Sequence, residues 1–500
     1  MKLPNAGSIF FLLCLINLLN YIDRGIVPGS PIQFQSFITS CIMGIPDMSL
    51  AHENMYLGLL VSAFIAGYSI FSIPFGYWAI HCRPFLLISV GLSIWILAML
   101  LCGLADPAHS LVLLFVGRIL SGIGESSFQA IVPSFIEDFA PASKRTLWLG
   151  IFYCGITIGT ATGYFYSALF AKSSLRWPWA YYAEGLAMLP LVLICSFCIP
   201  AKFDLPSGHQ HMEPVSFAKE LGGILKNPLF MIMSLGSSAY VFSISGLAAF
   251  GPSLLIGLGL FEESSAAMVF GGIIVVAGTI GTLMGGFLLD RSCTTANNDL
   301  FRLGMATRQA LGFLSIGTAT LLVSWVCLDQ DLNMVSMVLL AVALTFLFGC
   351  VPASIVALLL SVEKRKRGLA LGINTMMSHL LGDVPSPVVL GMFKDYHAPQ
   401  CRTIPNDVVL HPDCANDRRG LKLTLLFPYA WLLWGIVLAG VGVCLAKKRR
   451  LPDVPARPVI LSGEDAAAQA NDPIDMSKPE EATDCWDDVV AASSSSTIVL

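Results

Sequence analysis

The sequence predicts an all-α membrane protein with twelve transmembrane helices in two six-helix bundles. Of its 500 residues, 55% are hydrophobic and only 12% are charged, whereas soluble domains carry about 25% charged residues. The apolar residues form long runs, and about 20 of them cross a bilayer as a helix. Because the ~10-residue strands of a membrane barrel are much shorter, helices are the expected spanning elements.

Twelve apolar runs account for these helices. We expect no cleavable leader, and we expect the first run itself to act as the insertion signal. The predicted spans are 4–28, 55–79, 85–104, 110–136, 147–171, 179–200, 229–259, 265–289, 309–328, 333–361, 368–392 and 421–446.

A polar segment divides the spans six and six. We predict an N-terminal bundle at 1–200, a cytoplasmic linker at 201–228 and a C-terminal bundle at 229–450. Residues 451–500 are acidic and Ser-rich without apolar periodicity, which predicts a disordered cytoplasmic tail. Paired halves are typical of secondary transporters.

The distribution of Lys and Arg sets the orientation. With the N-terminus placed in the cytoplasm, the cytoplasmic segments up to residue 450 hold eighteen Lys and Arg residues and the opposite side holds seven. This bias predicts that both termini are cytoplasmic. The cluster at 364–367 is interpreted as an anchor for anionic bilayer lipids and not as a nucleic-acid site.

Charged residues within the predicted spans are the main candidates for function, because each costs roughly 2.5–3.5 kcal/mol at the bilayer centre. Asp23 and Arg24 lie in the first span, Arg118 and Glu125 in the fourth. Arg118 and Glu125 are two helical turns apart and share a face. Asp23 and Arg118 lie at similar depths, so a pair between them is feasible. Ion pairs that only lock the two helices together are the structural alternative.

Three further acidic or basic residues extend this set. Glu184 lies near one end of the sixth span, where it has a functional role or simply reaches the interface. His379 and Asp383 are four residues apart on the eleventh span and share a face. Pro385 and Pro387 follow at once and predict a break in that helix. A broken helix beside a buried carboxylate resembles a transporter binding element, and a simple proline kink is the alternative.

Cysteine usage leaves one question open. Most of the fourteen cysteines lie in apolar runs and are expected to act as small hydrophobic residues. Cys401 and Cys414 share a long loop on the non-cytoplasmic side, where a disulfide is possible. We find no constellation of a nucleophile or of metal ligands, so we expect neither an enzyme nor a metal or other cofactor.

The charged motifs resemble those of the Spinster family of the major facilitator superfamily. The resemblance is carried by NLLNYIDRG at 17–25, GRILSGIGESSF at 117–128, Pro133, the stretch 148–153 and HLLGDVPSP at 379–387, and it covers about residues 8–440. It adds Asn20 and Tyr21 to the candidate site. It also implies a conformational loop at Gly286, Asp290 and Arg291, whose counterpart in the first half lacks the usual Asp-Arg because Ile80 and His81 stand there.

The resemblance implies an alternating-access carrier for sphingolipids or lysophospholipids, often coupled to protons. It implies a late endosomal, lysosomal or plasma membrane, and we expect a monomer in contact with bilayer lipids. We hypothesise that Asp23 and Glu125 gain and lose a proton while Arg118 exchanges between carboxylate and substrate, with Arg24 and Arg118 available to a phosphate. A facilitator for a sugar, amino acid or organic anion is the alternative.

Overall fold

The computed structural model describes residues 3, 5–42, 52–141, 145–204, 217–293, 299–363, 366–404 and 410–448. The tail predicted at 451–500 and most of the predicted linker lie outside these ranges. The described chain is almost entirely helical, with one isolated bridge between Thr403 and Leu410.

The first half contributes six long helices and one short one. They are α1 (Ala6–Gly29), α2 (Pro31–Ile42), α3 (Glu53–His81), α4 (Pro84–Leu104), α5 (Leu111–Phe139), α6 (Arg145–Lys172) and α7 (Pro178–Phe197). The short helix α2 follows α1 directly, in a segment that we had predicted only as a connection. Prolines at the first position of α4 and α7 pre-set the helical φ angle where no amide partner is needed.

The second half follows short elements at η2 (Ala201–Phe203) and α8 (Phe217–Leu225). Its helices are α9 (Pro228–Gly257), α10 (Glu263–Cys293), α11 (Asp299–Asp329), α12 (Asn333–Leu360), α13 (Arg367–Ser378), α14 (Pro385–His397) and α15 (Arg418–Lys448). The turns η5 (His379–Asp383) and η6 (Pro412–Asp417) lie between them. Asn227 begins α9 by accepting hydrogen bonds from the amides of Leu229 and Phe230.

The helix pattern agrees with the twelve predicted spans. Among the described residues, ten helices are long and apolar enough to cross a membrane. Helix α6 and the broken unit α13–η5–α14 occupy the places of the fifth and eleventh predicted spans. Large apolar side chains such as Leu186, Phe197 and Met334 are more than 70% exposed, which suits a surface that faces lipid tails.

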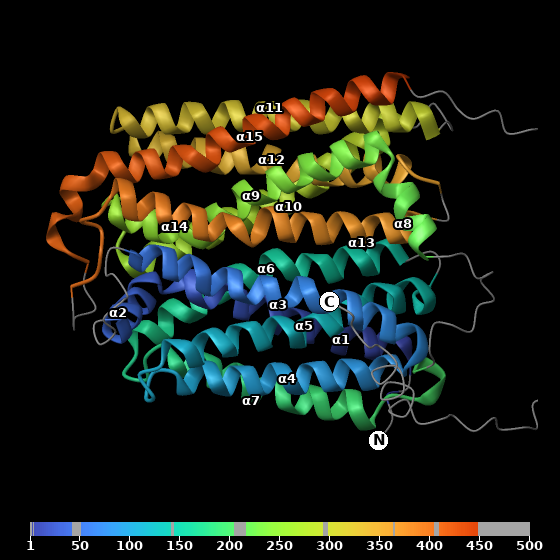
Figure 1. Ribbon diagram of the computed structural model, residues 1–500, viewed down its shortest axis with the longest axis horizontal. Coiled ribbons are helices and arrows are strands. Elements are labelled where there is room, and N and C mark those ends of the chain that lie inside the picture. Colours follow the sequence, from blue (N-terminus) through green and yellow to red (C-terminus); the bar gives the residue numbers. More distant parts are fainter. Residues whose placement is uncertain are drawn as a thin grey trace, which may run out of the picture. The chain divides into compact units, whose positions relative to one another are not determined.

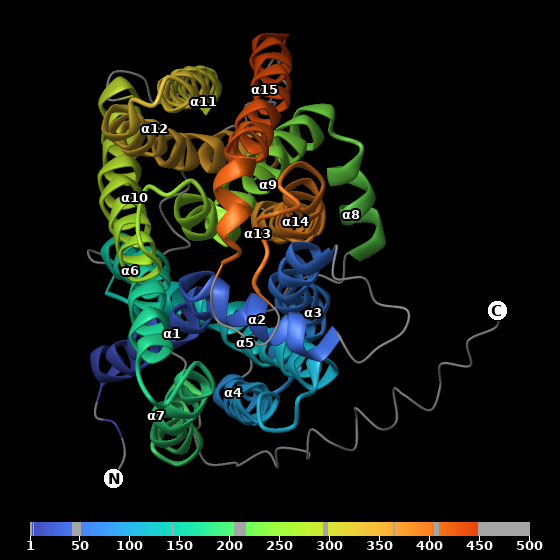
Figure 2. The same cartoon turned by 90° about the vertical axis from the view of Figure 1, so that its left-hand side faces the viewer.

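Helices of the first half pack against helices of the second along two lines. Helix α3 lies beside α14, and α6 lies beside α10 (Figures 1 and 2). Glycines permit the closest approach: a Cβ atom at Gly58 would stand 2.2 Å from the carbonyl oxygen of Pro387. Helix α2 lies at one end of the bundle, which we call the α2 end, and α8 lies at the other (Figure 1).

Within the first half, α6 packs tightly on α1. The four-residue spacing of Gly155, Gly159 and Gly163 predicts such packing. A Cβ at Gly159 would lie 2.6 Å from the Cβ of Tyr21, and one at Gly163 would lie 2.2 Å from the carbonyl oxygen of Ile22. This packing fixes the face that α1 turns toward α5.

Candidate functional site

Two buried ion pairs join α1 to α5. Arg118 donates from Nη1 to Oδ1 of Asp23 at 2.5 Å, and Arg24 donates from Nη2 to Oε1 of Glu125 at 2.5 Å. The contact between Asp23 and Arg118 that the sequence makes feasible is present, and the second pair completes a neutral set of four charges. Neutral pairing lowers the cost of holding these groups in a medium of low polarity.

The two pairs differ in accessibility. The Arg118 and Asp23 side chains are 2% and 0% exposed, whereas Arg24 is 22% exposed beside a fully buried Glu125. Arg24 is therefore the cation that a molecule entering the bundle can reach, and the Asp23–Arg118 pair lies behind it.

Aromatic rings surround the guanidinium groups. The Arg24 guanidinium carbon lies 4.7 Å from the ring centre of Tyr21, 4.9 Å from Phe64 and 5.1 Å from Tyr68. Arg118 lies 4.8 Å from the same Phe64 ring. Contacts of this kind stabilise a cation without neutralising it, so the rings hold Arg24 in place while leaving its charge available to an anion.

Each ion pair uses only one contact. Among the described residues, Oδ2 of Asp23, Oε2 of Glu125 and the Nε atoms of both arginines are buried and have no hydrogen-bond partner. A two-point arginine–carboxylate contact would be stronger and more rigid. The single-contact geometry leaves spare donors and acceptors within the site, which is what a change of partners requires.

The second half contributes His379 and Asp383 at the break in its eleventh span. The break is a π-helical turn, η5, in which the amide of Val384 donates to the carbonyl oxygen of His379 at 2.9 Å. Pro385, which has no amide hydrogen, begins α14 immediately afterwards. Nδ1 of His379 lies 2.5 Å from Oδ2 of Asp383, and both side chains are 18% exposed.

This turn is supported from both halves. Ser62 on α3 donates to the carbonyl oxygen of Val384 at 2.5 Å, and Ser386 donates to the carbonyl oxygen of Phe242 on α9. Ser62 satisfies a backbone acceptor at the break, and Ser386 joins the start of α14 to α9. The Asp383 carboxylate, which can only accept hydrogen bonds when ionised, contacts His379. The π turn is a local irregularity of the type that often marks functional sites.

Tyr68 connects the two groups of charges. Its ring packs edge-on against the His379 ring, with 5.2 Å between ring centres, and it also lies against the Arg24 guanidinium. Contacts therefore run from Glu125 through Arg24 and Tyr68 to His379 across the two halves. We call these residues, together with Asp23, Arg118 and Asp383, the central cluster.

The remaining candidates occupy different positions. Asn20 and Glu184 are 0% and 2% exposed, and their side-chain polar atoms have no partner among the described residues. Glu184 therefore does not reach the interface. Gly286, Asp290 and Arg291 lie within the last turns of the continuous helix α10 and not in a loop. Their role in conformational change stays a prediction.

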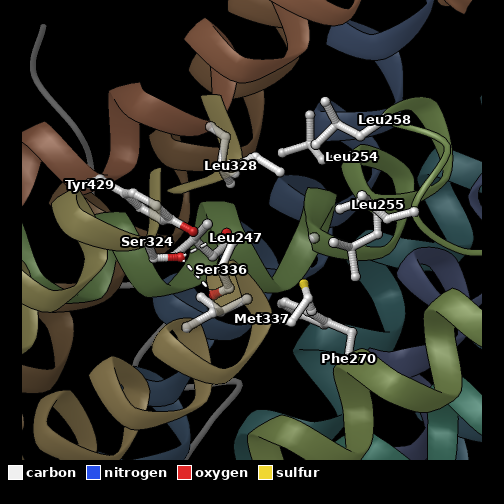
Figure 3. Close-up of a pocket in the computed structure, with 14 residues that line it drawn as sticks. Leu247, Leu254, Leu255, Leu258, Phe270, Ser324, Leu328, Ser336, Met337 and Tyr429 are labelled. Carbon is white, nitrogen blue, oxygen red and sulfur yellow. Dashed lines mark hydrogen bonds between the residues drawn. The ribbon is translucent and has the colours of Figure 1, made fainter. Parts of the chain in front are cut away.

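A separate apolar pocket lies in the second half between α9, α10, α11, α12 and α15 (Figure 3). None of its fourteen lining residues is charged, and Ser324 binds Ser336 within it. It shares no residue with the central cluster. This pocket offers no counter-ion for a charged substrate, whereas the central cluster contains charged groups of both signs.

Comparison with known proteins decides the family. Residues 13–384 match the family model described as Major Facilitator Superfamily. A protein of Arabidopsis thaliana described as "Probable sphingolipid transporter spinster homolog 1" is 31% identical over 429 residues, which cover 78% of this chain and 83% of that relative. The chain belongs to the Spinster family of the major facilitator superfamily. It is therefore a membrane transporter and not an enzyme.

Solved structures agree on the fold of this Spinster-family transporter. A bacterial homologue of the human lysosomal transporter Spinster, in an inward-facing and unoccupied conformation, aligns with a TM-score of 0.71 and 19% identity, covering 91% of this chain and 100% of that chain. A D-xylose–proton symporter aligns with a TM-score of 0.60 and 16% identity, covering 88% and 97%. The shared architecture thus includes a carrier of a small polar solute.

Sequence reasoning missed a second polar cluster at the α2 end of the transporter. Asp395 on α14 accepts hydrogen bonds from the amides of Asn54 and Met55 at 3.1 and 2.8 Å. Glu53 accepts from the Thr39 hydroxyl at 2.8 Å and from the Thr403 hydroxyl at 3.2 Å. We call Glu53, Asn54, Asp395 and Thr403 the α3–α14 clasp.

The sequence does not predict the clasp, because its charged members lie outside the predicted spans. The predicted second span began at residue 55 and the predicted eleventh ended at 392, so Glu53 and Asp395 lay just outside them. In the structure both helices continue past these limits, and the two carboxylates are 1% and 9% exposed. One feature of the sequence does point to the clasp: charged residues flank the second and eleventh predicted spans at the same end of the bundle.

Proposed function

We propose that this transporter carries an amphiphilic lipid, a lysophospholipid or a sphingolipid, across a membrane by alternating access, with protons as the coupling ion. The observation that carries the proposal is the central cluster: a partly accessible Arg24 with a buried carboxylate partner, held among aromatic rings and connected through Tyr68 to His379. The description of the Arabidopsis relative as a probable sphingolipid transporter supports the same substrate class.

Arg24 is the residue best placed to bind an anionic head group. Its guanidinium has planar donors that match a phosphate, and its Nε atom is without a partner among the described residues. Binding of a phosphate at Arg24 draws the guanidinium from Glu125, which then takes up a proton because a buried carboxylate without a counter-ion is costly. Substrate binding and protonation are linked in this way.

The α3–α14 clasp supplies the conformational half of the mechanism. It joins the helices of the two halves at the α2 end, and a buried apolar contact between Tyr164 on α6 and Phe270 on α10 joins them further along. We assign the α2 end to the non-cytoplasmic side, in keeping with the distribution of Lys and Arg. The conformation is then one that is closed to the outside, with both termini in the cytoplasm.

Opening to the outside requires these contacts to part while the halves rock about the central cluster. We place the moving halves at 1–200 and 229–450 and expect the carrier to act as a monomer. A late endosomal, lysosomal or plasma membrane is the proposed location.

Uptake by purified protein in proteoliposomes tests the proposal. Labelled lysophosphatidylcholine, a labelled sphingoid phosphate and labelled D-xylose are compared with and without an imposed pH gradient. Saturable uptake of a lipid that the gradient accelerates supports the proposal. Uptake of D-xylose alone rejects the lipid substrate, and lipid uptake that ignores the gradient rejects proton coupling.

Two variants assign the site. Arg24→Ala should abolish saturable lipid uptake, whereas Arg176→Ala should not, because Arg176 is 56% exposed and pairs with Asp106 away from the cluster. Glu125→Gln should remove the effect of the pH gradient. Normal uptake by Arg24→Ala, or an unchanged gradient response in Glu125→Gln, removes the corresponding residue from the mechanism.

A further inference from the structure

Glu184 is a buried carboxyl group without a counter-ion of its own, because both arginines of the central cluster already pair with other carboxylates. It lies on α7, is 2% exposed, and neither of its oxygens has a hydrogen-bond partner among the described residues. A structural carboxylate in such a place would be expected to accept hydrogen bonds. Its burial without partners therefore needs a chemical explanation.

The neighbours of Glu184 come from every helix that packs on α7 near it. Helix α7 packs against α1, α4 and α6. The charged and titratable groups within electrostatic range of Glu184 are Asp23 on α1, Arg118 on α5, Cys102 on α4, Tyr166 on α6 and Tyr181 on α7 itself. Arg118 is the one cation in this set, and it already binds Asp23.

Counting charges leads to one excess proton. Asp23, Glu125 and Glu184 are three acids, and Arg24 and Arg118 are two bases. Each arginine neutralises one carboxylate, so a third ionised carboxylate would be an uncompensated buried charge, which is strongly unfavourable. Two acids beside one cation share a proton in the same way as two carboxylates at one site do.

We propose that Asp23 and Glu184 hold one proton between them, that Arg118 pairs with whichever of them is ionised, and that this proton moves with the substrate in addition to the one that Glu125 takes up. The proposal rests on the proton-coupled transport proposed above and names a second partner for Arg118. In the present conformation Asp23 is the ionised acid and Glu184 carries the proton.

The exchange conserves charge. When Arg118 swings from Asp23 to Glu184, one O–H bond breaks at Glu184 and one forms at Asp23. The net charge of the three groups stays the same, so no unpaired ion is created within the membrane. The proton has then moved from α7 to α1, next to the accessible Arg24, and the single contact between Arg118 and Asp23 allows this change of partner.

Glu184→Gln tests the exchange because glutamine has the shape of the protonated acid and cannot ionise. Proteoliposome assays compare uptake driven by a pH gradient with equilibrium exchange of the same labelled lysophosphatidylcholine. The ratio of driven uptake to exchange should fall at least about fivefold, the lower end of typical coupling between two sites. Glu184→Asp, which can ionise, should restore part of the ratio, and Glu262→Gln at an exposed position should leave it unchanged.

Infrared spectroscopy gives a second readout that does not depend on flux. The wild-type protein should show a protonated-carboxyl absorption that Glu184→Gln lacks. An unchanged ratio, or an unchanged absorption, overturns the role of Glu184. A wild-type protein that ignores the gradient rejects proton coupling as a whole, so the two failures are distinguishable.

Discussion

Asp395 on α14 acts as the N-cap of α3, a helix of the other half, through its contact with Asn54. Its Oδ1 accepts hydrogen bonds from the backbone amide of Asn54 at 3.1 Å and from the side-chain amide at 2.7 Å, and its Oδ2 accepts from the amide of Met55 at 2.8 Å. His52, which precedes α3, supplies no side-chain cap. The amides in the first turn of α3 are thus satisfied only while the two halves touch, so the cap depends on conformation.

Asp395→Ala should open the α2 end. Loss of hydrogen bonds to a charged group costs about 1.5–3 kcal/mol, and each 1.4 kcal/mol changes a population ratio about tenfold. Spin labels at His52 and Tyr396, both exposed beside the clasp, should show a larger fraction of long distances by double electron–electron resonance.

Asp417→Ala is the matched control for this experiment. Asp417 also accepts a hydrogen bond from a backbone amide, that of Gln400 at 2.6 Å, but both residues belong to the second half. Its loss should leave the distance distribution unchanged. A distribution that responds equally to both variants, or to neither, contradicts the role of the clasp.

Gly58→Ala should act on the same equilibrium through packing. An added Cβ would stand 2.2 Å from the carbonyl oxygen of Pro387 on α14, whose backbone cannot move aside without parting the helices. Overpacking of this kind costs about 1–3 kcal/mol, and the cost falls only on the conformation in which α3 and α14 touch. The same spin-label pair should report opening.

Gly76→Ala on the same helix is its control, because a Cβ at Gly76 meets no atom within 4 Å. It should leave the distances unchanged and add slightly to helix propensity. Opening by Gly76→Ala would point to a general effect on α3 and not to contact with α14.

Periodicity and the cost of intramembrane charge explain what could be predicted from the sequence. The apolar runs define the spanning helices because a helix in lipid has to satisfy its backbone internally. The depth of Asp23 and Arg118 along their helices indicates that a pair between them is feasible, and the structure contains it. The break at His379–Asp383 was predictable because Pro385 removes an amide donor.

What could not be predicted depends on relations between helices. Nothing in a one-dimensional pattern says that Arg24 binds Glu125 and lies over Phe64, since that depends on the rotation of α1 against α3 and α5. The burial of Glu184 could not be predicted for the same reason. A residue six positions inside α7 faces either the lipid headgroups or the neighbouring helices, depending on the rotation of α7. The clasp required two span ends, distant in sequence, to be matched in space.

Removal of one member of the Asp23–Arg118 pair should destabilise the protein more than removal of both. In a Glu184→Gln background, which removes the other acid proposed to pair with Arg118, Asp23→Ala leaves a buried guanidinium unpaired, at a cost of about 3–5 kcal/mol, whereas an apolar replacement of both partners is often close to neutral. In detergent, Asp23→Ala should therefore have a lower melting temperature than the double variant Asp23→Ala/Arg118→Leu in this background. Transport should be lost in both.

The exposed pair between Arg176 and Asp106 provides the reference. Asp106→Ala should change the free energy of unfolding by no more than about 1 kcal/mol, as is usual for surface ion pairs. Equal melting temperatures for Asp23→Ala and the double variant would mean that the interior pair is not electrostatically isolated from water.

The Cys401–Cys414 disulfide offers a further test of the clasp. The structure contains this bond, whose cysteines have a sequence separation of 13, and such bonds persist in oxidising compartments. Because Thr403 lies two residues beyond Cys401 and binds Glu53, the bond holds one side of the clasp in place. Closing a loop of this size contributes about 3 kcal/mol by the chain-entropy model, so the double Ser variant should melt earlier and open more at the α2 end.

Labelling of intact cells addresses the orientation. An impermeant maleimide should modify a cysteine introduced at Tyr396, which is 81% exposed beside the clasp, from outside if the carrier is at the plasma membrane, or from the lumen in organelles opened by detergent. Cys293, in the last turn of α10 near the other end of the bundle, should react only from the cytoplasmic side. The reverse pattern would place the clasp in the cytoplasm and invert the conformation assigned to this structure.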